Sequence, residues 1–265
     1  MRYQTKKRFG QHFLHDPAII DKIITAARLD ADQRVLEIGP GLGVLTERLL
    51  ARVRQVTVME IDTDLTERLR QRREPSLVVC EGDVLRLDWW ELLSEPPYTL
   101  VANLPYNISS QVVFRILEHR ALFQRLVLMF QREVAQRLTA APGGRDYGIL
   151  SVLCQLWYDI DAVTLVKPGA FRPPPKVDSM VLSFAPLSRP RVDPVDEVLF
   201  RRLVKAAFTQ RRKTLRNSLL AAGLPAPDID HCLAAARIAP ARRGETLTLD
   251  DFSALTAAFK VLPDG

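Results

Sequence analysis

The chain has 265 residues, 47% of them hydrophobic and 26% charged, and 37 Lys and Arg against 31 Asp and Glu give a net charge of +6. This is the composition of an average soluble globular protein, and it excludes a disordered, collagen-like or coiled-coil chain. No apolar run approaches the roughly 20 residues of a membrane-spanning helix, and the basic first ten residues lack a following signal-peptide core. The length predicts one large domain, or a large domain with a smaller companion.

The elements over the first half of the chain alternate between strand and helix. Asp16 is a good N-cap and Pro17 fits the first helical position, so a helix is predicted over 16–28. The same patterns predict strands over 34–39, 55–60, 77–80, 98–102 and 126–130, and further helices over 44–53, 64–72, 110–119 and 131–140. Strands and helices that alternate at this spacing indicate crossover units and a mostly parallel sheet.

The pattern changes after a Gly-Gly turn at 143–144. An apolar stretch over 147–158 is followed by two predicted strands, 160–166 and 177–184, which are joined through a Pro-rich segment. The remaining apolar stripes have helical spacing, and Thr248 with Asp251 resembles a capping box. We therefore predict an α/β domain with an N-terminal arm over 1–187, and a small helical domain over 188–265.

The cysteines and histidines point to no metal site. Cys80, Cys154 and Cys232 are far apart and odd in number, and the four histidines have no ligand spacing. This fits neither a disulfide framework nor a zinc site, and it is typical of a reducing compartment. We expect a cytoplasmic protein without a bound metal.

The positive charge is concentrated in two clusters that contain no acid. The first lies in residues 1–10 and includes Lys6, Lys7 and Arg8. The second lies in residues 205–216 and consists of Lys205, Arg211, Arg212, Lys213 and Arg216. Each cluster is either a solvated surface or a contact for a phosphate backbone, and charge alone does not separate the two.

A glycine-rich turn follows the first predicted strand of the sheet. Gly39, Gly41 and Gly43 stand at alternate positions, which lets the backbone turn tightly and approach a ligand closely. The spacing departs from the dinucleotide fingerprint, because Val44 stands where that motif has its last glycine. The turn also lacks the Lys-Ser/Thr of a P-loop, so nucleoside triphosphate chemistry is not expected. On its own, the turn could equally serve without a ligand.

Two acids at the ends of the next strands favour a ligand. Glu60 ends the second strand, where a carboxylate can accept both ribose hydroxyls of a nucleoside. Asp83 follows the third strand and could accept an exocyclic amine of adenine. Either could be an ordinary loop acid, but together they predict a site for an adenosine-containing cofactor. S-adenosylmethionine is favoured because it has no phosphate and its sulfonium suits an acidic wall, to which Glu37 adds.

The loop after the fourth strand reads Asn103-Leu104-Pro105-Tyr106-Asn107. The Asn103 amide oxygen is a hydrogen-bond acceptor, and Pro105 holds Leu104 extended so that its carbonyl is presented. An adenine N6 amine is a poor nucleophile because its lone pair is delocalised into the ring. Two acceptors on its N–H groups could free that lone pair, with Tyr106 stacked on the base. The alternative is a turn with a buried tyrosine.

These segments together are characteristic of a known family. Residues 9–14 (FGQHFL), 37–43 (EIGPGLG), 103–107 (NLPYN) and 171–179 (FRPPPKVDS) occur in this order. The chain resembles the small-subunit ribosomal RNA adenine N6,N6-dimethyltransferases over essentially its whole length. It departs at His12, where many relatives have Asn. The resemblance implies an α/β fold with a Rossmann-like S-adenosylmethionine-dependent methyltransferase sheet and a small C-terminal helical domain.

The resemblance also implies roles for particular residues. The cofactor site would comprise Gln11, His12, Leu14, Gly39, Gly41, Glu60, Asp83 and Asn103. The target adenine would be held by Asn103, Leu104, Pro105 and Tyr106, with Phe171 stacked on its opposite face. The RNA contacts would be the two basic clusters, which comprise Lys6, Lys7, Arg8, Lys205, Arg211, Arg212, Lys213 and Arg216.

The family dimethylates two adjacent adenosines in a hairpin near the 3′ end of small-subunit rRNA, late in ribosome assembly. The implied partner is therefore the rRNA of an immature 30S-type particle, and we expect a monomeric enzyme. Two alternatives stay open from the sequence. One is dimethylation of large-subunit rRNA, and the other is a mainly non-catalytic assembly factor that binds immature subunits.

Overall fold

The computed structural model describes residue 6 and residues 10–262, and the chain forms two compact units. Unit 1 contains the residues up to 135 together with 160–186, and unit 2 contains 136–159 together with the residues from 187 onward. The predicted domain boundary at 187/188 lies one residue after the point at which the chain passes from unit 1 to unit 2 for the last time. Residues 136–159, which we predicted within the first domain, cluster with the C-terminal helices.

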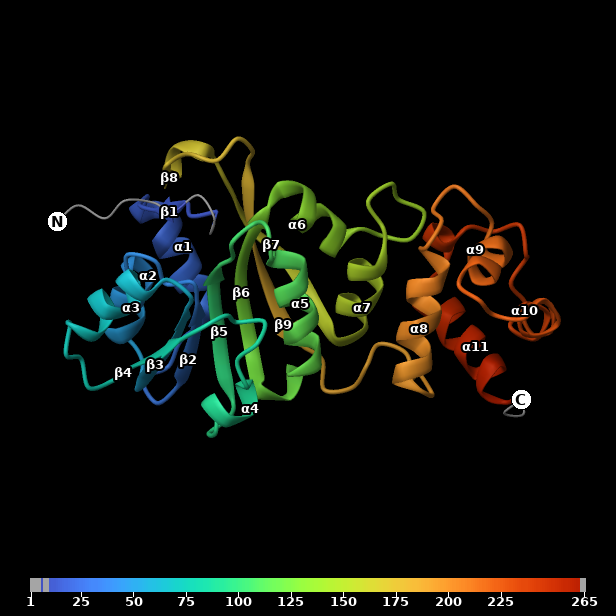
Figure 1. Ribbon diagram of the computed structural model, residues 1–265, viewed down its shortest axis with the longest axis horizontal. Coiled ribbons are helices and arrows are strands. Elements are labelled where there is room, and N and C mark those ends of the chain that lie inside the picture. Colours follow the sequence, from blue (N-terminus) through green and yellow to red (C-terminus); the bar gives the residue numbers. More distant parts are fainter. Residues whose placement is uncertain (1–5, 7–9, 263–265) are drawn as a thin grey trace. The chain divides into compact units, whose positions relative to one another are not determined.

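Unit 1 is built on a seven-stranded sheet with the order β4-β3-β2-β5-β6-β9-β7 (Figure 1). Its strands are β2 (Arg34–Ile38), β3 (Gln55–Glu60), β4 (Leu77–Glu81), β5 (Tyr98–Asn103), β6 (Phe123–Gln131), β7 (Tyr158–Val166) and β9 (Ser179–Pro186). Strands β4, β3, β2, β5 and β6 are parallel to one another, and β9 is antiparallel to β6. The predicted α/β class with a mostly parallel sheet is confirmed.

The helices that accompany these strands are those expected from crossover units. They are α1 (Pro17–Ala27), α2 (Val44–Leu50), α3 (Thr63–Arg70), α4 (Trp89–Leu92), α5 (Ser109–Glu118) and α6 (Arg132–Thr139). Asp16 caps α1 as predicted, because its side chain accepts the backbone N–H groups of Ala18 and Ile19. The apolar stripe of α1 packs on the sheet beside Val35, Val101 and Val127. Buried apolar residues on the parallel strands explain their near-continuous hydrophobic runs.

A second sheet has two antiparallel strands and is separate from the seven-stranded sheet. Strand β1 (Phe13–Leu14) pairs with β8 (Phe171–Arg172), with Phe13 opposite Arg172 and Leu14 opposite Phe171. Strands of two residues carry no readable alternation, which is why the sequence did not predict them. The pairing joins the N-terminal segment to the Pro-rich segment, about 160 residues further along the chain.

Unit 2 is helical apart from its connections. Its helices are α7 (Ile149–Trp157), α8 (Glu197–Ala207), α9 (Leu215–Ala221), α10 (Ala226–Ala235) and α11 (Leu249–Lys260), so the apolar stretch over 147–158 is mostly a helix. An aromatic cluster joins α8 to α11, with the ring of Phe252 6.1 Å from Phe200 and 6.3 Å from Phe208. The predicted capping box of Thr248 and Asp251 begins α11.

Three features of the described residues bear on function. Among residues 6 and 10–262, none of the helices has both the length and the apolar character needed to span a membrane. Within the same described residues, no group of three or more His, Cys, Asp or Glu side chains is arranged to hold a metal ion. The three cysteines are free, with Cys154 and Cys232 buried.

Candidate functional site

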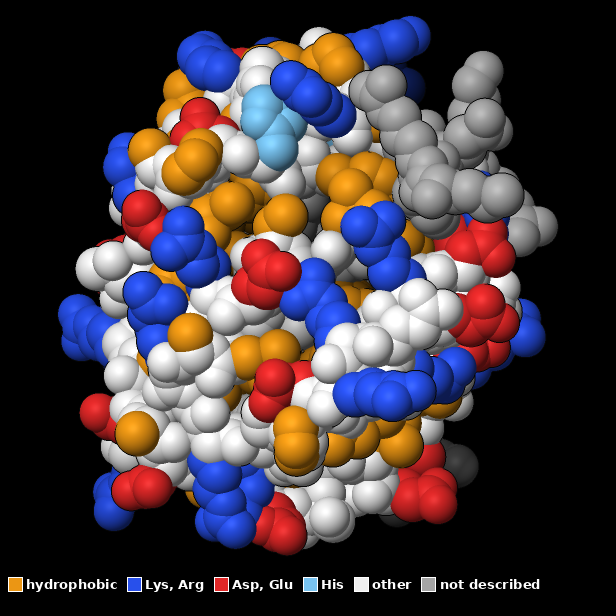
Figure 2. Space-filling view, turned by 90° about the vertical axis from the view of Figure 1, so that its left-hand side faces the viewer, with side chains coloured by type: hydrophobic (Ala, Val, Ile, Leu, Met, Phe, Trp, Pro, Cys, Tyr) orange, Lys and Arg blue, Asp and Glu red, His pale blue; other side chains and the backbone are white. Residues whose placement is uncertain are grey.

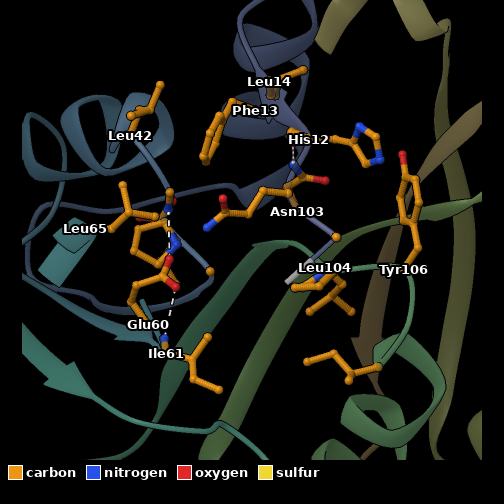
Figure 3. A pocket seen from close by; sticks show the side chains of 18 of the residues that line it. His12, Phe13, Leu14, Leu42, Glu60, Ile61, Leu65, Asn103, Leu104 and Tyr106 are labelled. Atoms are coloured by element: carbon orange, nitrogen blue, oxygen red, sulfur yellow. Dashed lines mark hydrogen bonds between the residues drawn. The ribbon is translucent and has the colours of Figure 1, made fainter. Parts of the chain in front are cut away.

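A cavity of about 310 Å³ lies at the carboxyl ends of the parallel strands in unit 1. Its walls come from residues 10–14 of the N-terminal segment and from residues that end or follow β2, β3, β4 and β5, namely 37, 39–42, 44–45, 60–61, 65, 83, 85 and 103–108. Open α/β sheets bind ligands at this edge, and the volume is that of a small-molecule site. Figure 3 shows the cavity between the glycine-rich turn on one side and Tyr106 on the other.

The glycine-rich turn needs its glycines for two separate reasons. Gly39, Gly41 and Gly43 have φ angles of 67°, 58° and 82°, in the left-handed region that L side chains rarely adopt. Close packing adds a second constraint at Gly41, where a Cβ would lie 2.8 Å from Cδ1 of Phe13. The absent side chain therefore lets the N-terminal segment approach the turn.

Glu60 is held at the end of β3 by backbone hydrogen bonds. Its Oε1 accepts the N–H groups of Ile61 at 2.9 Å and Asp62 at 3.0 Å, and its Oε2 accepts that of Gly41 at 3.3 Å (Figure 3). Burial raises the pKa of this carboxyl, and the three backbone donors oppose the rise. A carboxylate has about four acceptor positions, so Glu60 keeps capacity for a ligand hydroxyl.

Glu37 is a second buried acid in the cavity wall. It is 1% exposed, and its Oε2 accepts a hydrogen bond of 2.6 Å from Oγ1 of Thr46. Burial raises its pKa to about 8, and the charge of Glu60 adds to the rise. A positively charged ligand would favour the ionised form of Glu37, so this wall suits a cation.

Asp83 and four apolar side chains complete the wall near Glu60. Asp83 Oδ1 accepts the N–H of Leu85 at 3.0 Å, and Oδ2 lies 3.7 Å from Nε of Arg86. The apolar part consists of Leu42, Ile61, Leu65 and Leu85. An acid beside apolar side chains matches a planar purine with an exocyclic amine, so these residues fit the adenosyl group of S-adenosylmethionine.

The orientation of Asn103 is set by the N-terminal segment. Its Nδ2 donates a hydrogen bond of 3.1 Å to the backbone carbonyl of His12 (Figure 3). This hydrogen bond fixes which way the amide points, so that Oδ1 is the atom that can accept a hydrogen bond from a substrate. Leu104 is also fixed, since its N–H donates to the carbonyl of Met129 at 3.3 Å.

Tyr106 and His12 face each other at the side of the cavity away from Glu60. Their ring centroids are 5.5 Å apart with an interplanar angle of 26°, and Figure 3 shows the imidazole beside the phenol ring. The Tyr106 hydroxyl is 2.6 Å from Oγ of Ser179, and Nδ1 of His12 donates to the carbonyl of Pro173 at 2.7 Å. Burial raises the pKa of Tyr106. His12, Tyr106 and the pair Pro173 and Ser179 belong to three different motifs of the sequence, so these motifs contact one another beside the cavity.

Phe171 does not line the cavity. Its side chain is 2% exposed and packs within the core of unit 1, while its backbone pairs with Leu14. The ring that lies against Tyr106 in this structure is that of His12. The stacking role of Phe171 therefore stays a prediction, and it requires this side chain to leave the core when a base binds.

All eight predicted cofactor residues line the cavity, namely Gln11, His12, Leu14, Gly39, Gly41, Glu60, Asp83 and Asn103. Gly10, Phe13 and Asp62 were not predicted as site residues. The first two line the cavity, and Asp62, which is 1% exposed, donates its backbone N–H to Glu60. Asp62 stands two residues after Glu60, and an acid so close to a predicted ligand-binding residue is a signal that the sequence contained.

The predicted RNA contacts divide into two groups. Lys205, Arg211, Arg212 and Lys213 are exposed, but the side chains of Arg211 and Arg216 are hydrogen-bonded within unit 2. Arg211 Nη2 donates to the carbonyls of residues 145 and 147, and Arg216 forms two hydrogen bonds of 2.6 and 2.7 Å with Asp230. Lys7 and Arg8 lie outside the described residues. Figure 2 shows a face of the molecule on which Lys and Arg are interspersed with Asp and Glu.

The parallel sheet, the glycine-rich turn and the acid-lined cavity define a Rossmann-like S-adenosylmethionine-dependent methyltransferase. The model of the family "Ribosomal RNA adenine dimethylase" matches residues 2–254, and the chain belongs to this family. It is therefore an enzyme that uses S-adenosylmethionine to dimethylate adenine in rRNA.

Individual relatives agree with this assignment. The chain is 59% identical to "Ribosomal RNA small subunit methyltransferase A" of Syntrophotalea carbinolica, over 96% of this chain and 97% of that protein. It is 49% identical to the protein of that name in Geobacter sulfurreducens, over 96% of this chain and 94% of that one. Among solved structures, a dimethyladenosine transferase from Plasmodium falciparum has a TM-score of 0.76 at 30% identity, covering 92% of this chain and 96% of the other. The 23S rRNA methyltransferase ErmE has a TM-score of 0.68 at 28% identity, covering 94% and 99%.

Proposed function

We propose that this enzyme dimethylates N6 of two adjacent adenosines in the 3′-terminal hairpin of small-subunit, 16S-type rRNA. The proposed substrate is an immature 30S-type particle in the cytoplasm, and the enzyme acts as a monomer late in subunit assembly. The support for a small-subunit target is the name shared by the relatives that are 59% and 49% identical.

The observation that carries the chemistry is the orientation of Asn103. Because Nδ2 donates to the His12 carbonyl, Oδ1 accepts one N6–H of the target adenine, and the Leu104 carbonyl accepts the other. Hydrogen bonds to both N–H groups favour a pyramidal N6 whose lone pair is directed at the methyl donor. Tyr106 holds the base by stacking after the base has been unstacked from the RNA.

The cofactor, when bound, supplies an electrophilic methyl group on a sulfonium. Each transfer forms an N–C bond at N6 and breaks the S–C bond, and the N6 proton then leaves to solvent. Asn103 is neutral and cannot take up this proton as a base, so its role is to position the amine. After the first transfer N6 retains one N–H, and the methylated amine must bind again in the same slot.

The test uses labelled S-adenosylmethionine with immature small subunits, large subunits and naked rRNA. The methylated nucleotides are then mapped on the RNA. We expect label on two adjacent adenines of the small-subunit 3′ hairpin. Label confined to the large subunit would instead support the activity named for ErmE. Binding to immature subunits without any transfer would support the assembly-factor alternative.

The Asn103→Ala variant links the mapped activity to the site. Loss of a positioned hydrogen-bond acceptor should lower kcat by about 10²–10³-fold. Asn217→Ala is the matched control, because Asn217 is exposed on α9 in unit 2. Equal activity of the two variants would remove Asn103 from the proposed chemistry.

A further inference from the structure

The N-terminal segment forms one wall of the cofactor cavity, and its described part is Lys6 with residues 10–14. We call this part the strap. Residues 10–14 all line the cavity. One end of the strap is fixed by the pairing of β1 with β8 and by the hydrogen bond from Asn103 to the His12 carbonyl. Any ligand in the cavity lies against this wall.

The other end of the strap is tied through Asp62 to the loop that follows β3, the strand that ends in Glu60. Lys6 Nζ is 2.6 Å from Oδ1 of Asp62 and 2.6 Å from Oδ2 of Asp64. Gln11 Nε2 donates to Oδ2 of Asp62 at 3.0 Å, and Gln11 Oε1 accepts the backbone N–H of Lys6 at 2.8 Å. Both oxygens of Asp62 therefore contact the strap, and Lys6 contacts Gln11 as well.

Asp62 also belongs to the structure that holds Glu60. It is the N-cap of α3, where Oδ1 accepts the N–H of Asp64 at 3.1 Å, and its own N–H donates to Oε1 of Glu60 at 3.0 Å. The Asp62 side chain is wholly buried, whereas that of Lys6 is 28% exposed. A buried carboxylate needs a charged or hydrogen-bonding partner, and the strap supplies both kinds. The two acids in turn raise the pKa of Lys6.

We propose that Lys6 and Asp62 are positioning residues that hold the strap closed over bound S-adenosylmethionine. The Lys6–Asp62 contact links the cavity wall formed by the strap to the loop that carries Glu60. Opening of this contact releases that wall and lets the cofactor exchange between successive methyl transfers. Lys6 thereby serves the cofactor site, in contrast to its predicted contact with RNA.

The affinity for S-adenosylmethionine depends on the fraction of the protein in which the strap is closed. A ligand that binds only the closed state has an apparent Kd equal to its intrinsic Kd divided by the fraction of closed protein. Weakening the contact lowers that fraction and raises the measured Kd. The contact spans the cavity wall without touching the reacting atoms, so kcat at saturating cofactor should change little.

The experiment measures the Kd of S-adenosylmethionine by calorimetry on the full chain, without RNA. The variants are Lys6→Met, Asp62→Asn and the double variant, because Asn keeps the N-cap hydrogen bond while it removes the charge. Lys22→Met is the control, since Lys22 Nζ donates a hydrogen bond of 3.1 Å to Thr164 Oγ1 and Lys22 does not line the cavity. We expect each test variant to raise the Kd about tenfold, as for one lost contact between charged groups.

The double variant tests whether the two residues act together. If they do, the double variant raises the Kd no further than either single variant. Hydrogen exchange of residues 10–14 in the cofactor-free protein should be faster in Lys6→Met than in Lys22→Met. An unchanged Kd in Lys6→Met, or effects of the two single variants that multiply, would overturn the proposal. Since no RNA is present, either result is independent of the proposed rRNA target.

Discussion

Replacing Gly41 by alanine tests the packing of the N-terminal segment on the glycine-rich turn. Gly41 has φ 58°, so any L residue there costs about 1–2 kcal/mol in backbone strain. The new Cβ would also lie 2.8 and 2.9 Å from Cδ1 and Cε1 of Phe13, well inside the contact distance of roughly 3.5–4.0 Å between carbon atoms. Forcing such an overlap costs about 1–3 kcal/mol.

Gly39→Ala is the matched comparison within the same turn. Its φ of 67° is nearly the same, but the nearest atom to its added Cβ is Cδ of Pro105 at an ordinary 3.8 Å. Gly39→Ala should therefore carry the backbone strain without the overlap. In urea-induced unfolding, Gly41→Ala should be less stable than Gly39→Ala by about 1–3 kcal/mol, which is the overlap cost.

A double-mutant cycle with Phe13→Ala assigns the difference to a particular contact. Truncating Phe13 removes both atoms that the new Cβ would meet, so Gly41→Ala should then cost only the backbone strain. The two alanine substitutions in the turn should become nearly equal in the Phe13→Ala background. If Gly41→Ala costs the same with and without Phe13, the overlap does not explain the glycine, and the reasoning is refuted.

Two further predictions concern charge. The raised pKa of Glu37, about 8, means that the folded protein retains a proton that the unfolded chain loses, so stability without cofactor should fall as pH rises toward 8. Relative to Glu37→Gln, the wild type should lose up to about 1.4 kcal/mol per pH unit in this window, measured by urea unfolding, and parallel pH profiles would contradict this. The pair Arg212→Glu and Lys213→Glu should weaken binding to immature subunits and flatten its salt dependence, with the Kd for S-adenosylmethionine unchanged. Unchanged binding at low salt would show that both residues belong to a solvated surface that does not contact RNA.

Much of the sheet could be predicted because its signals are local. The strands β2, β3, β5 and β6 are short apolar runs followed by helical stripes, and parallel strands that are buried on both faces read in this way. Strands β1 and β8 could not be predicted, since two residues carry no period. They form because two segments about 160 residues apart in the sequence pair with each other in the fold.

The candidate site shows the same division. Glu60 and Asp83 could be placed because both follow predicted strands, and the ends of parallel strands meet at one edge of the sheet. The orientation of Asn103 could not, since it depends on the backbone carbonyl of His12. The burial of Phe171 also depends on tertiary packing, because a proline-rich segment has no period that marks its inner face.

The basic clusters show why sequence charge overestimates an RNA-binding surface. A run of Lys and Arg without acids looks unpaired in sequence, yet its partners come from elsewhere in the fold. Lys6 contacts Asp62, 56 residues away, and Arg216 is bidentate on Asp230. An arginine already paired in this way must lose its partner before it contacts phosphate, which reduces what the new contact contributes. Within the described residues, the exposed side chain of Arg212 has no ion pair to break, so Arg212 is the stronger candidate for RNA binding.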